Sequence, residues 1–425
     1  MEGVELGSEF ELDITGIAHG GITVGRHEGR VVFVTGAIPG ERVRVRLTEA
    51  AKSSFWRADA VAVLEASPHR RDHIWPEAGI DGDPADRPGG AEFGHIALPH
   101  QRALKEQVIA EAFARQAKGV EVPTITVQPT PTETEDGTGW RTRVTLHVDE
   151  DGNVGPYAAR SHRVVDVDGL PLLVPELEHF ALHGEGDSSK RPERLSLLRT
   201  ADGELVELID DEGGDLVITE RVGERTFRLA ANGFWQVHRE APEVLSRAIK
   251  DILTGSAPND FGHHLDLYGG VGLLGAAFLD AFGPQHLTTV EADRKASGFA
   301  KENLSRRLGR RSADPGAAPG EIEAVAAGVA GYLRRTLSMA TERERDAFAR
   351  GTIILDPPRS GAGKDVVRAL AQLRPAQLVY VACDPVALAR DVALFAEQGY
   401  RVVKAQAYDL FPNTHHVETV ALLSR

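Results

Sequence analysis

The chain is poor in sulfur and has no long apolar run. Its 425 residues include one cysteine, Cys383, and two methionines. A single cysteine cannot form an internal disulfide or a multi-cysteine metal site, so the sequence excludes both. No apolar run approaches the roughly 18 residues that a membrane-spanning helix needs. The acidic start MEGVELGSEFELD also lacks the basic and apolar regions of a signal peptide, so we expect a cytoplasmic protein without membrane contact.

Positive charge is scarce as well. The chain has 48 lysines and arginines against 63 aspartates and glutamates, which gives a formal net charge of -15. Tight, unspecific binding to nucleic acid or to an anionic membrane is therefore not expected, because phosphate binding draws on clustered basic residues. The average still leaves room for a local basic face. The length predicts two or three domains, since single cores stop growing at about 250 to 300 residues.

Residues 1–66 predict a small β-barrel, because short β-like runs alternate with glycine and proline turns. Within ERVRVRL, strand alternation places Arg42, Arg44 and Arg46 on one face and the apolar residues on the other. This arginine face is either an ordinary solvated surface or a phosphate-binding surface. Further basic residues nearby favour the second interpretation: Lys52, Arg57, Arg70 and Arg71.

Residues 67–238 predict an α+β middle domain. A loop-like segment rich in Gly, Pro and Asp spans residues 72–94. Helical periodicity follows over residues 98–116, and alternating β-like runs return from about 124 to 230.

From residue 239 to residue 425 strands alternate with helices, which predicts a mostly parallel α/β sheet covered by helices. The last two runs, YRVVKAQAYDLF and HHVETVALLSR, are joined by a short turn and predict an antiparallel pair. Residues 311–321 have the composition of a flexible surface insertion.

A glycine motif indicates a cofactor. The residues from Gly270 through Gly272 to Gly275 follow the strand HLDLY and open a helix, as the G-x-G-x-x-G pattern requires. Glu291 ends the next strand, where a carboxylate accepts hydrogen bonds from ribose hydroxyls. NAD and S-adenosylmethionine both meet this description, and the alternative is a tight strand-to-helix turn that holds no ligand.

The next strand favours S-adenosylmethionine over NAD as the cofactor. It ends in Asp356-Pro357-Pro358, a rigid turn at the carboxyl edge of the sheet, where ligands sit in such folds. Amino-directed methyltransferases commonly follow a similar motif with an aromatic residue, whereas this chain has Arg359. The target is therefore not expected to be an exocyclic amine. An ordinary turn is the alternative.

Cys383 ends the strand after the one that delivers Asp356, so both residues should meet at one edge of the sheet. A lone cysteine is otherwise more often a small core residue. A thiol at this edge suits methylation at C5 of uracil, a carbon that is too weak a nucleophile by itself. Thiolate attack at C6 turns the ring into an enolate with electron density at C5.

That reaction also needs a base, because the C5 proton must be removed before the cysteine can leave. Glu418 starts the final strand, an apolar run in which a carboxylate is unexpected, and His415 and His416 precede it. Burial there would raise the pKa of the carboxyl into a useful range. An exposed glutamate at a strand end is the alternative.

Together these motifs resemble the RNA (uracil-5-)-methyltransferase family. The matching segments are CDP at 383–385, DPPR at 356–359, FPNTHHVE at 411–418 and FWQV at 234–237. Residues 9–66 resemble the TRAM RNA-binding barrel found at the start of the ribosomal-RNA members. The resemblance covers nearly the whole chain and implies a TRAM, OB-like barrel, an α+β middle domain and a class I, Rossmann-like methyltransferase domain.

The resemblance also implies roles for individual residues. Cys383 is the expected nucleophile, Glu418 the expected base, and Phe234 matches an aromatic residue expected near the flipped base. The implied S-adenosylmethionine site is lined by Gln236, Tyr268, Glu291 and Asp356, with Gly270 and Gly272 from the glycine motif.

Two features depart from the family pattern. Many TRAM-bearing relatives carry four cysteines that hold a 4Fe–4S cluster, whereas this chain has Ala91 and Leu170 at expected ligand positions. No cluster can form, so the loop must be held in another way. Relatives often place Asn after the glycines where this chain has Leu273, so one cofactor contact is expected to be missing.

The sequence is interpreted as an S-adenosylmethionine-dependent enzyme that makes 5-methyluridine in structured RNA. The barrel favours 23S ribosomal RNA, with transfer RNA as the alternative. The uridine must flip out of its stack to reach Cys383. We expect the arginine face, Arg141 and Arg143 to supply the binding energy, with steep salt dependence and low affinity for arbitrary RNA. We expect a monomer.

Two other functions remain open at this stage. A nicotinamide oxidoreductase is supported only by the glycine motif, and methyl transfer from labelled S-adenosylmethionine would separate the two. A non-catalytic RNA-binding protein that retained the fold is the other, and the intact Cys383 and Glu418 argue against it.

Overall fold

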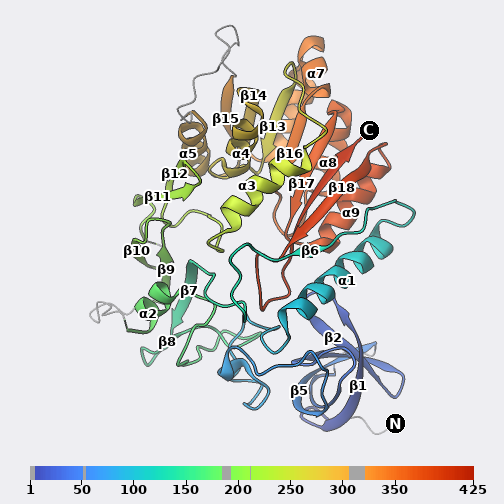
Figure 1. Cartoon of the computed structure of the whole chain (residues 1–425), viewed down its shortest axis with the longest axis vertical. Coiled ribbons are helices and arrows are strands. Elements are labelled where there is room, and N and C mark those ends of the chain that lie inside the picture. The colour runs from blue at the N-terminus through green and yellow to red at the C-terminus, as the bar shows by residue number, and fades with distance from the viewer. Residues whose placement is uncertain (1–4, 51–53, 184–192, 211, 306–320) are drawn as a thin grey trace.

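The computed structural model describes residues 5–50, 54–183, 193–210, 212–305 and 321–425. Lys52 and nearly all of the predicted insertion at 311–321 lie outside these residues. The barrel, the middle segment and the α/β sheet follow one another in Figure 1 from the blue end of the chain to the red end. Within the described residues, every helix is too short or too polar to cross a bilayer.

The N-terminal strands close into a barrel in the order β1-β2-β3-β5-β4. Their bounds are β1 (Glu9–Ala18), β2 (Ile22–His27), β3 (Arg30–Thr35), β4 (Arg42–Glu49) and β5 (Phe55–Glu65). Val43, Val45 and Leu47 of β4 are buried inside, whereas Arg42 and Arg44 point outward and are exposed. The predicted barrel and the alternation along β4 are confirmed, because β4 buries every second side chain from Val43 to Leu47.

The middle segment is built from a long helix and several short strands. The elements are η1 (Pro76–Ala78), α1 (Leu98–Gln116), β6 (Val127–Gln128), β7 (Arg143–Val148), β8 (Val154–Gly155), α2 (Pro175–His183), β9 (Arg194–Arg199), β10 (Leu205–Ile209), β11 (Val217–Val222) and β12 (Arg225–Ala230). Four strands form a sheet in the order β10-β9-β7-β8, and β11 pairs with β12.

Two of these elements pack with the C-terminal domain. β6 pairs with β18 (Arg401–Tyr408) and so extends the large sheet, and α1 lies against α9 (Pro385–Ala396). Ile109 and Phe113 of α1 and Val127 of β6 belong to the same apolar core as the α/β strands. The core of the C-terminal domain therefore includes residues that precede it by more than a hundred positions.

The C-terminal domain is an eight-stranded sheet with helices on both faces (Figure 1). Its elements are α3 (Ala241–Ile252), β13 (His263–Leu267), α4 (Leu273–Phe282), β14 (His286–Glu291), α5 (Arg294–Ser305), β15 (Ile322–Ala326), α6 (Val329–Met339), α7 (Glu342–Ala349), β16 (Thr352–Leu355), α8 (Gly363–Leu373), β17 (Gln377–Ala382), α9 (Pro385–Ala396), β18 (Arg401–Tyr408) and β19 (Glu418–Ser424).

The strand order explains how the site is assembled. The order is β15-β14-β13-β16-β17-β19-β18-β6, and the pairs from β15 to β17 are parallel. The last two long strands form the predicted antiparallel pair, and β19 inserts between β17 and β18. Because β19 runs against β17, its first residue lies at the edge where the parallel strands end.

Candidate active site

Cys383 and Glu418 lie at the same end of one antiparallel strand pair. Ala382, the last residue of β17, faces Thr419 of β19, so Cys383 and Glu418 are the next residues outward on the two strands. Residues opposite one another in such a pair have Cα atoms about 5 Å apart. Cys383 is partly exposed, and Glu418 is 6% exposed. The structure thus brings the predicted nucleophile and base together.

Burial dominates the electrostatics of this pair. Burial, followed by the carboxylates of Glu418 and Asp356, raises the pKa of the Cys383 thiol to about 12, while Arg359 opposes the rise. Burial and the charge of Asp356 hold the pKa of Glu418 well above that of an ordinary glutamate. An ionised carboxylate with a raised pKa is a strong base for removing a proton from carbon.

Asp356 and Arg359 lie near Cys383 on the loop that follows β16. Hydrogen bonds to a residue of α9 fix this loop. Tyr380 and the backbone N–H groups of Ala362 and Gly363 all donate hydrogen bonds to Asp391, which is fully buried, at 2.7, 2.7 and 3.2 Å. A Cβ atom on Gly361 would lie 2.6 Å from Asp391 Oδ2, so only glycine fits there. The loop is therefore fixed before any ligand binds.

Cys383 opens onto a pocket of about 250 Å³. Apolar side chains of Phe93, Leu104 and Val108 form one wall. The polar lining comes from separate parts of the chain: His19, Lys105, Arg359, Asp384, His415 and His416. The sulfur is therefore accessible from a cavity rather than enclosed in apolar packing.

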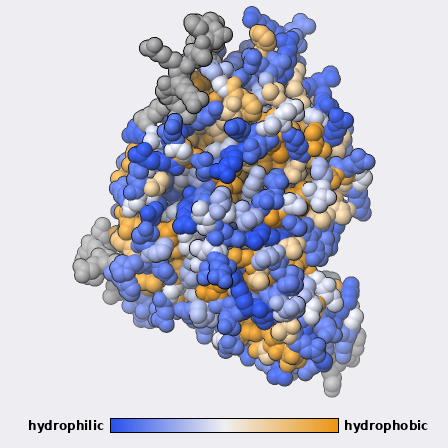
Figure 2. Space-filling view, viewed as in Figure 1, coloured by the Kyte–Doolittle hydropathy of each residue, from blue (hydrophilic) through white to orange (hydrophobic). Residues whose placement is uncertain are grey.

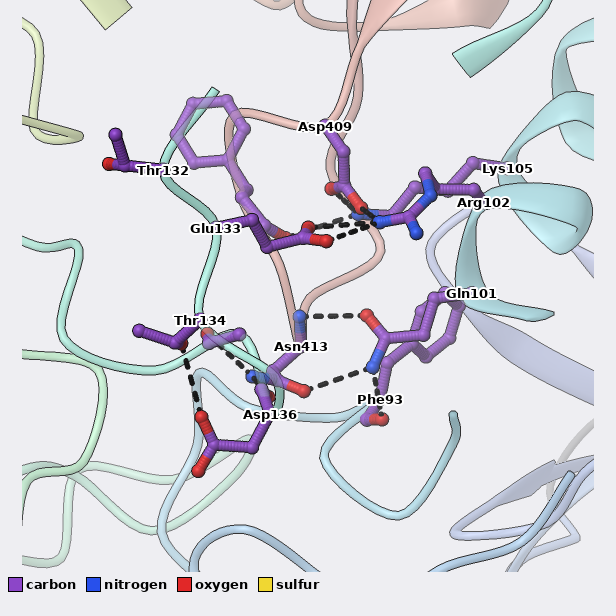
Figure 3. A network of polar contacts seen from close by, with 12 residues as sticks. Phe93, Gln101, Arg102, Lys105, Thr132, Glu133, Thr134, Asp136, Asp409 and Asn413 are labelled. Atoms are coloured by element: carbon purple, nitrogen blue, oxygen red, sulfur yellow. Dashed lines mark hydrogen bonds and ion pairs between the residues drawn. The ribbon is translucent and has the colours of Figure 1, made fainter. Parts of the chain in front are cut away.

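The loop that carries His415 and His416 and leads to Glu418 is clamped by buried amides. Figure 3 shows Gln101 of α1 and Asn413 facing each other. Asn413 N donates to Gln101 Oε1 at 2.8 Å, and Gln101 Nε2 donates to Asn413 Oδ1 at 2.9 Å. Asn413 Nδ2 donates to the carbonyl oxygen of Gly137 at 2.8 Å. Asn413 has a φ of 66°, so these bonds hold a left-handed residue in place.

A buried ion pair fixes the beginning of the same loop (Figure 3). Lys105 Nζ donates to Asp409 Oδ1 at 2.5 Å and to the carbonyl oxygen of Phe411 at 3.1 Å. The Lys105 side chain is 1% exposed and the Asp409 side chain is fully buried. Breaking a buried pair of this kind costs about 3 to 5 kcal/mol, because one charge is left uncompensated.

The glycine turn forms a cradle at the neighbouring strand end. Gly270 and Gly272 have φ values of 54° and 92°, and Tyr268 is also left-handed at 62°. Gly270 N donates to Glu291 Oε2 at 3.0 Å, so the predicted ribose-binding carboxylate lies beside the turn. A Cβ atom on Gly269 would lie 2.1 Å from Thr289 Oγ1, which excludes a larger residue.

Asp266 lies beneath this cradle and is fully buried in β13. Its Oδ2 atom accepts a hydrogen bond from Gly275 N at 3.1 Å, whereas Oδ1 has no partner among the described residues. Burial raises the pKa of Asp266 to about 7, and burial together with Asp266 raises that of Asp356 to about 7. Two carboxyls at a glycine-rich strand edge suit a cationic, ribose-containing cofactor.

Comparison with known proteins identifies the family. Residues 329–425 match the tRNA (Uracil-5-)-methyltransferase family model and residues 3–61 match the TRAM domain. The chain is 35% identical to an RNA methyltransferase of Streptomyces avermitilis over 98% of both chains. It is 30% identical to the 23S rRNA (uracil(1939)-C(5))-methyltransferase RlmD of Chromohalobacter salexigens, over 97% of this chain and 89% of that protein. The chain belongs to the RNA (uracil-5-)-methyltransferase family.

A solved structure supports the same fold. The tRNA (uracil-54, C5)-methyltransferase of Pyrococcus abyssi, solved with S-adenosyl-L-homocysteine, superimposes with a TM-score of 0.66. The match covers 97% of this chain and 100% of that chain at 19% identity. The predicted family, enzyme class and multidomain fold are confirmed.

The enzyme's FWQV segment follows β12. Phe234 is 74% exposed, Trp235 is buried in the core, and Gln236 is partly buried. A phenylalanine ring that is mostly exposed is available for stacking on a base. Its role near the flipped base stays a prediction.

The predicted RNA-binding arginines of the middle segment, Arg141 and Arg143, form hydrogen bonds and an ion pair within the protein. Arg143 donates to the carbonyl oxygen of Gly233 at 3.1 Å and pairs with Glu220 at 3.4 Å. Arg141 Nε donates to the carbonyl oxygen of Arg143 at 2.8 Å. Both arginines line a cavity of about 320 Å³ that also includes Arg194, so the site is basic. RNA binding there stays a prediction.

The arginine face of the barrel is offset by acidic neighbours. Arg42 pairs with Glu11 at 2.6 Å and Arg46 pairs with Glu9 at 3.2 Å. Arg44 is exposed and lies opposite Glu11 in the β1–β4 ladder. The alternation in the sequence predicted that these arginines share one face of their strand. It did not predict that glutamates of the neighbouring strand β1 lie beside them.

The loop without cluster cysteines is held by apolar packing and by hydrogen bonds. Ala91 and Leu170 are 2% and 6% exposed and belong to the same apolar cluster. The backbone N–H of Phe93 donates to the carbonyl oxygen of Asn413 at 2.9 Å, and Glu92 contacts His415. The loop is thereby joined directly to the segment that carries Glu418.

Sequence reasoning missed several residues of the site. They are Gln101, Lys105, Asp266, Asp391 and Asn413. A charged residue inside the apolar strand HLDL was a visible indication of Asp266. Lys105 and Gln101 lie on a helix of mixed polarity, where the sequence gives no sign that they are buried.

Proposed function

We propose that this enzyme methylates C5 of a uridine in structured RNA through a covalent Cys383–C6 adduct. The observation that carries the proposal is the placement of Cys383 and Glu418 across the end of β17 and β19, with Cys383 on the wall of a pocket. S-adenosylmethionine supplies the methyl group. Gln236, Tyr268, Glu291 and Asp356, with the turn at Gly270 and Gly272, are the residues that would hold it.

The residues of the chain would act in order. Cys383 as a thiolate forms a bond to C6, and the C5–C6 electron pair moves toward O4 as an enolate. C5 then takes the methyl group. Glu418 removes the proton from C5, the C5–C6 double bond re-forms, and the S–C6 bond breaks to release the thiolate. The products are 5-methyluridine, S-adenosylhomocysteine and one proton.

The favoured substrate is 23S ribosomal RNA. The identity to the 23S rRNA enzyme is 30%, against 19% for the tRNA enzyme of known structure. The TRAM barrel favours the same substrate by analogy. Such a substrate would place the enzyme in the cytoplasm, and mapping 5-methyluridine in total RNA with and without the gene decides between the two RNA classes.

Two substitutions test the mechanism. Cys383→Ala should abolish methyl transfer to RNA yet leave S-adenosylmethionine binding, measured by calorimetry, nearly unchanged. Glu418→Gln should accumulate a covalent protein–RNA adduct that survives a denaturing gel, because the cysteine cannot leave while the C5 proton remains. Glu397→Gln is the control, since Glu397 is exposed after α9 and should behave as wild type. Normal turnover by Glu418→Gln would remove that residue from the mechanism.

A further inference from the structure

The β1–β2 turn of the barrel reaches the catalytic pocket. His19, Gly20 and Gly21 line the same cavity as Cys383. His19 Nε2 lies 3.1 Å from Asp384 Oδ2. Asp384 directly follows the nucleophile and accepts the N–H of Ala387 at 2.8 Å as the N-cap of α9. One side chain of the barrel thus contacts the residue next to the predicted nucleophile.

Gly21 packs against another part of the pocket wall. A Cβ atom at this position would lie 2.6 Å from His415 Cβ and 3.0 Å from the Phe93 ring. His415 belongs to the loop that leads to Glu418. Gly21 has a φ of 73°, so the turn also needs a residue that accepts a left-handed backbone. The turn therefore contacts the nucleophile side and the base side of the pocket at once.

Apolar packing fixes the barrel in this position. Ile17 and Ile38 of the barrel form one buried cluster with Phe93, Ile96 and Leu104. Phe93 and Leu104 also form the apolar wall of the pocket. A shift of the barrel would therefore move the pocket wall, because close-packed side chains transmit displacement.

We infer that the barrel turn at 19–21 is a wall of the pocket that receives the flipped uridine, and that it positions this nucleotide for the chemical step. The inference rests on the proposed function. The pocket volume of about 250 Å³ lies near the lower end of small-ligand sites, about 300 Å³. Its apolar wall suits a nucleobase ring, and Arg359, which lines the pocket and is exposed, suits an adjacent phosphate. The barrel then contributes to kcat as well as to RNA affinity.

Gly21→Ala tests the inference against a matched control. Gly29→Ala places the same methyl group on a barrel turn with a φ of 80° and no atom within 4 Å, so it carries the backbone strain without the clash. At saturating RNA we expect Gly21→Ala to lose about tenfold to 100-fold in kcat, as displacements of about 1 Å do in active sites. Gly29→Ala should keep kcat within about twofold, since backbone strain alone leaves the site in place.

The rate of adduct formation is a second measurement. It distinguishes an effect on nucleotide positioning from an effect on protein folding or on RNA affinity. In the Glu418→Gln background, Gly21→Ala should slow adduct formation at saturating RNA while S-adenosylmethionine binding stays unchanged. His19→Ala, which adds no strain, should lower kcat in the same direction, and His19→Gln, which can still donate to Asp384, should restore part of it. His19→Ala decides the question if Gly21→Ala does not fold.

The outcomes are distinguishable. If the wild-type enzyme forms no adduct and transfers no methyl group to RNA, the proposed function is wrong. If the wild type is active and Gly21→Ala and His19→Ala change only the KM for RNA, the barrel turn acts in affinity alone and the inference is overturned.

Discussion

At the scale of single residues, the raised pKa of Cys383 favours the neutral thiol over the thiolate. Burial and the carboxylates of Glu418, Asp356 and Asp384 raise its pKa to about 12, and Arg359 is the cation that lowers it. A raised pKa means that the thiolate fraction at neutral pH is small. We therefore expect Cys383 of the free enzyme to react slowly with alkylating reagents at neutral pH.

This protonation state predicts how the thiol reacts with pH. Below its pKa the thiolate fraction rises about tenfold for each pH unit, so alkylation of Cys383 by iodoacetamide should keep accelerating from pH 7 to pH 10. A free cysteine thiol, with a pKa of about 8.5, levels off within that range. Mass spectrometry reads the rate directly because the chain has one cysteine.

Arg359→Gln is the paired variant for this measurement. Removing the cation should lower the alkylation rate further, because Arg359 favours the thiolate. A rate that levels off below pH 9 in the wild type would contradict the raised pKa.

At the scale of elements, Glu418, the proposed base, is positioned by helix α1 as well as by its own strand. Gln101 and Lys105, one turn apart on α1, hold Asn413 and Asp409 at two points of the final loop. The residues in these pairs are separated by 312 and 304 positions in the chain. The helix therefore couples the loop before it to the loop that carries Glu418.

Asn413→Ala tests this clamp. The substitution removes the Nδ2 donor from the buried carbonyl oxygen of Gly137, and an unmet buried group costs about 1 to 3 kcal/mol. A left-handed alanine adds about 1 kcal/mol. We expect a loss of about 3 kcal/mol in the free energy of urea unfolding, together with lower methylation.

Asn153→Ala is the matched control for the clamp. Asn153 is an exposed turn residue that bonds only Asp149 in the described structure, so its loss should cost no more than about 0.5 kcal/mol. Equal losses for the two variants would show that the clamp adds no stability.

At the scale of the whole molecule, an acidic enzyme must bind an acidic polymer. The net charge is -15, and the face seen in Figure 2 is mainly hydrophilic with scattered hydrophobic groups. Arg42 and Arg46 form ion pairs with Glu11 and Glu9 on the same barrel face. These carboxylates neutralise part of the positive charge of the arginines. Exposed pairs of this kind add little stability, so we expect them to limit RNA affinity more than they support the fold.

Removing the acidic partners of these two arginines should therefore strengthen RNA binding. The double variant Glu9→Gln, Glu11→Gln should bind RNA more tightly at low salt, with a log Kd against log salt slope steeper by roughly 0.7 to 0.9 for each new phosphate contact. Filter binding across a salt series measures the slope. The control Glu342→Gln, Glu397→Gln changes net charge equally at exposed sites on other elements. Identical slopes for both doubles would exclude the barrel face from the RNA contact.

The sequence by itself determined the three-part architecture and the residues at one edge of the sheet. Alternation along β4 predicts a strand with an arginine face, and strand–helix alternation predicts parallel strands whose carboxyl ends meet. Asp356 and Cys383 could be placed together for that reason, since both follow neighbouring parallel strands. These patterns are local, because side-chain period and strand direction are properties of a few consecutive residues.

Only the tertiary structure decided the partners of those residues. The insertion of β19 between β17 and β18 places Glu418 opposite Cys383, and packing of α1 on α9 buries Lys105 against Asp409. The pairing of Arg42 with Glu11 depends on which strand lies beside β4 in the closed barrel. Register and burial arise from contacts between distant segments, so no local pattern in the chain records them.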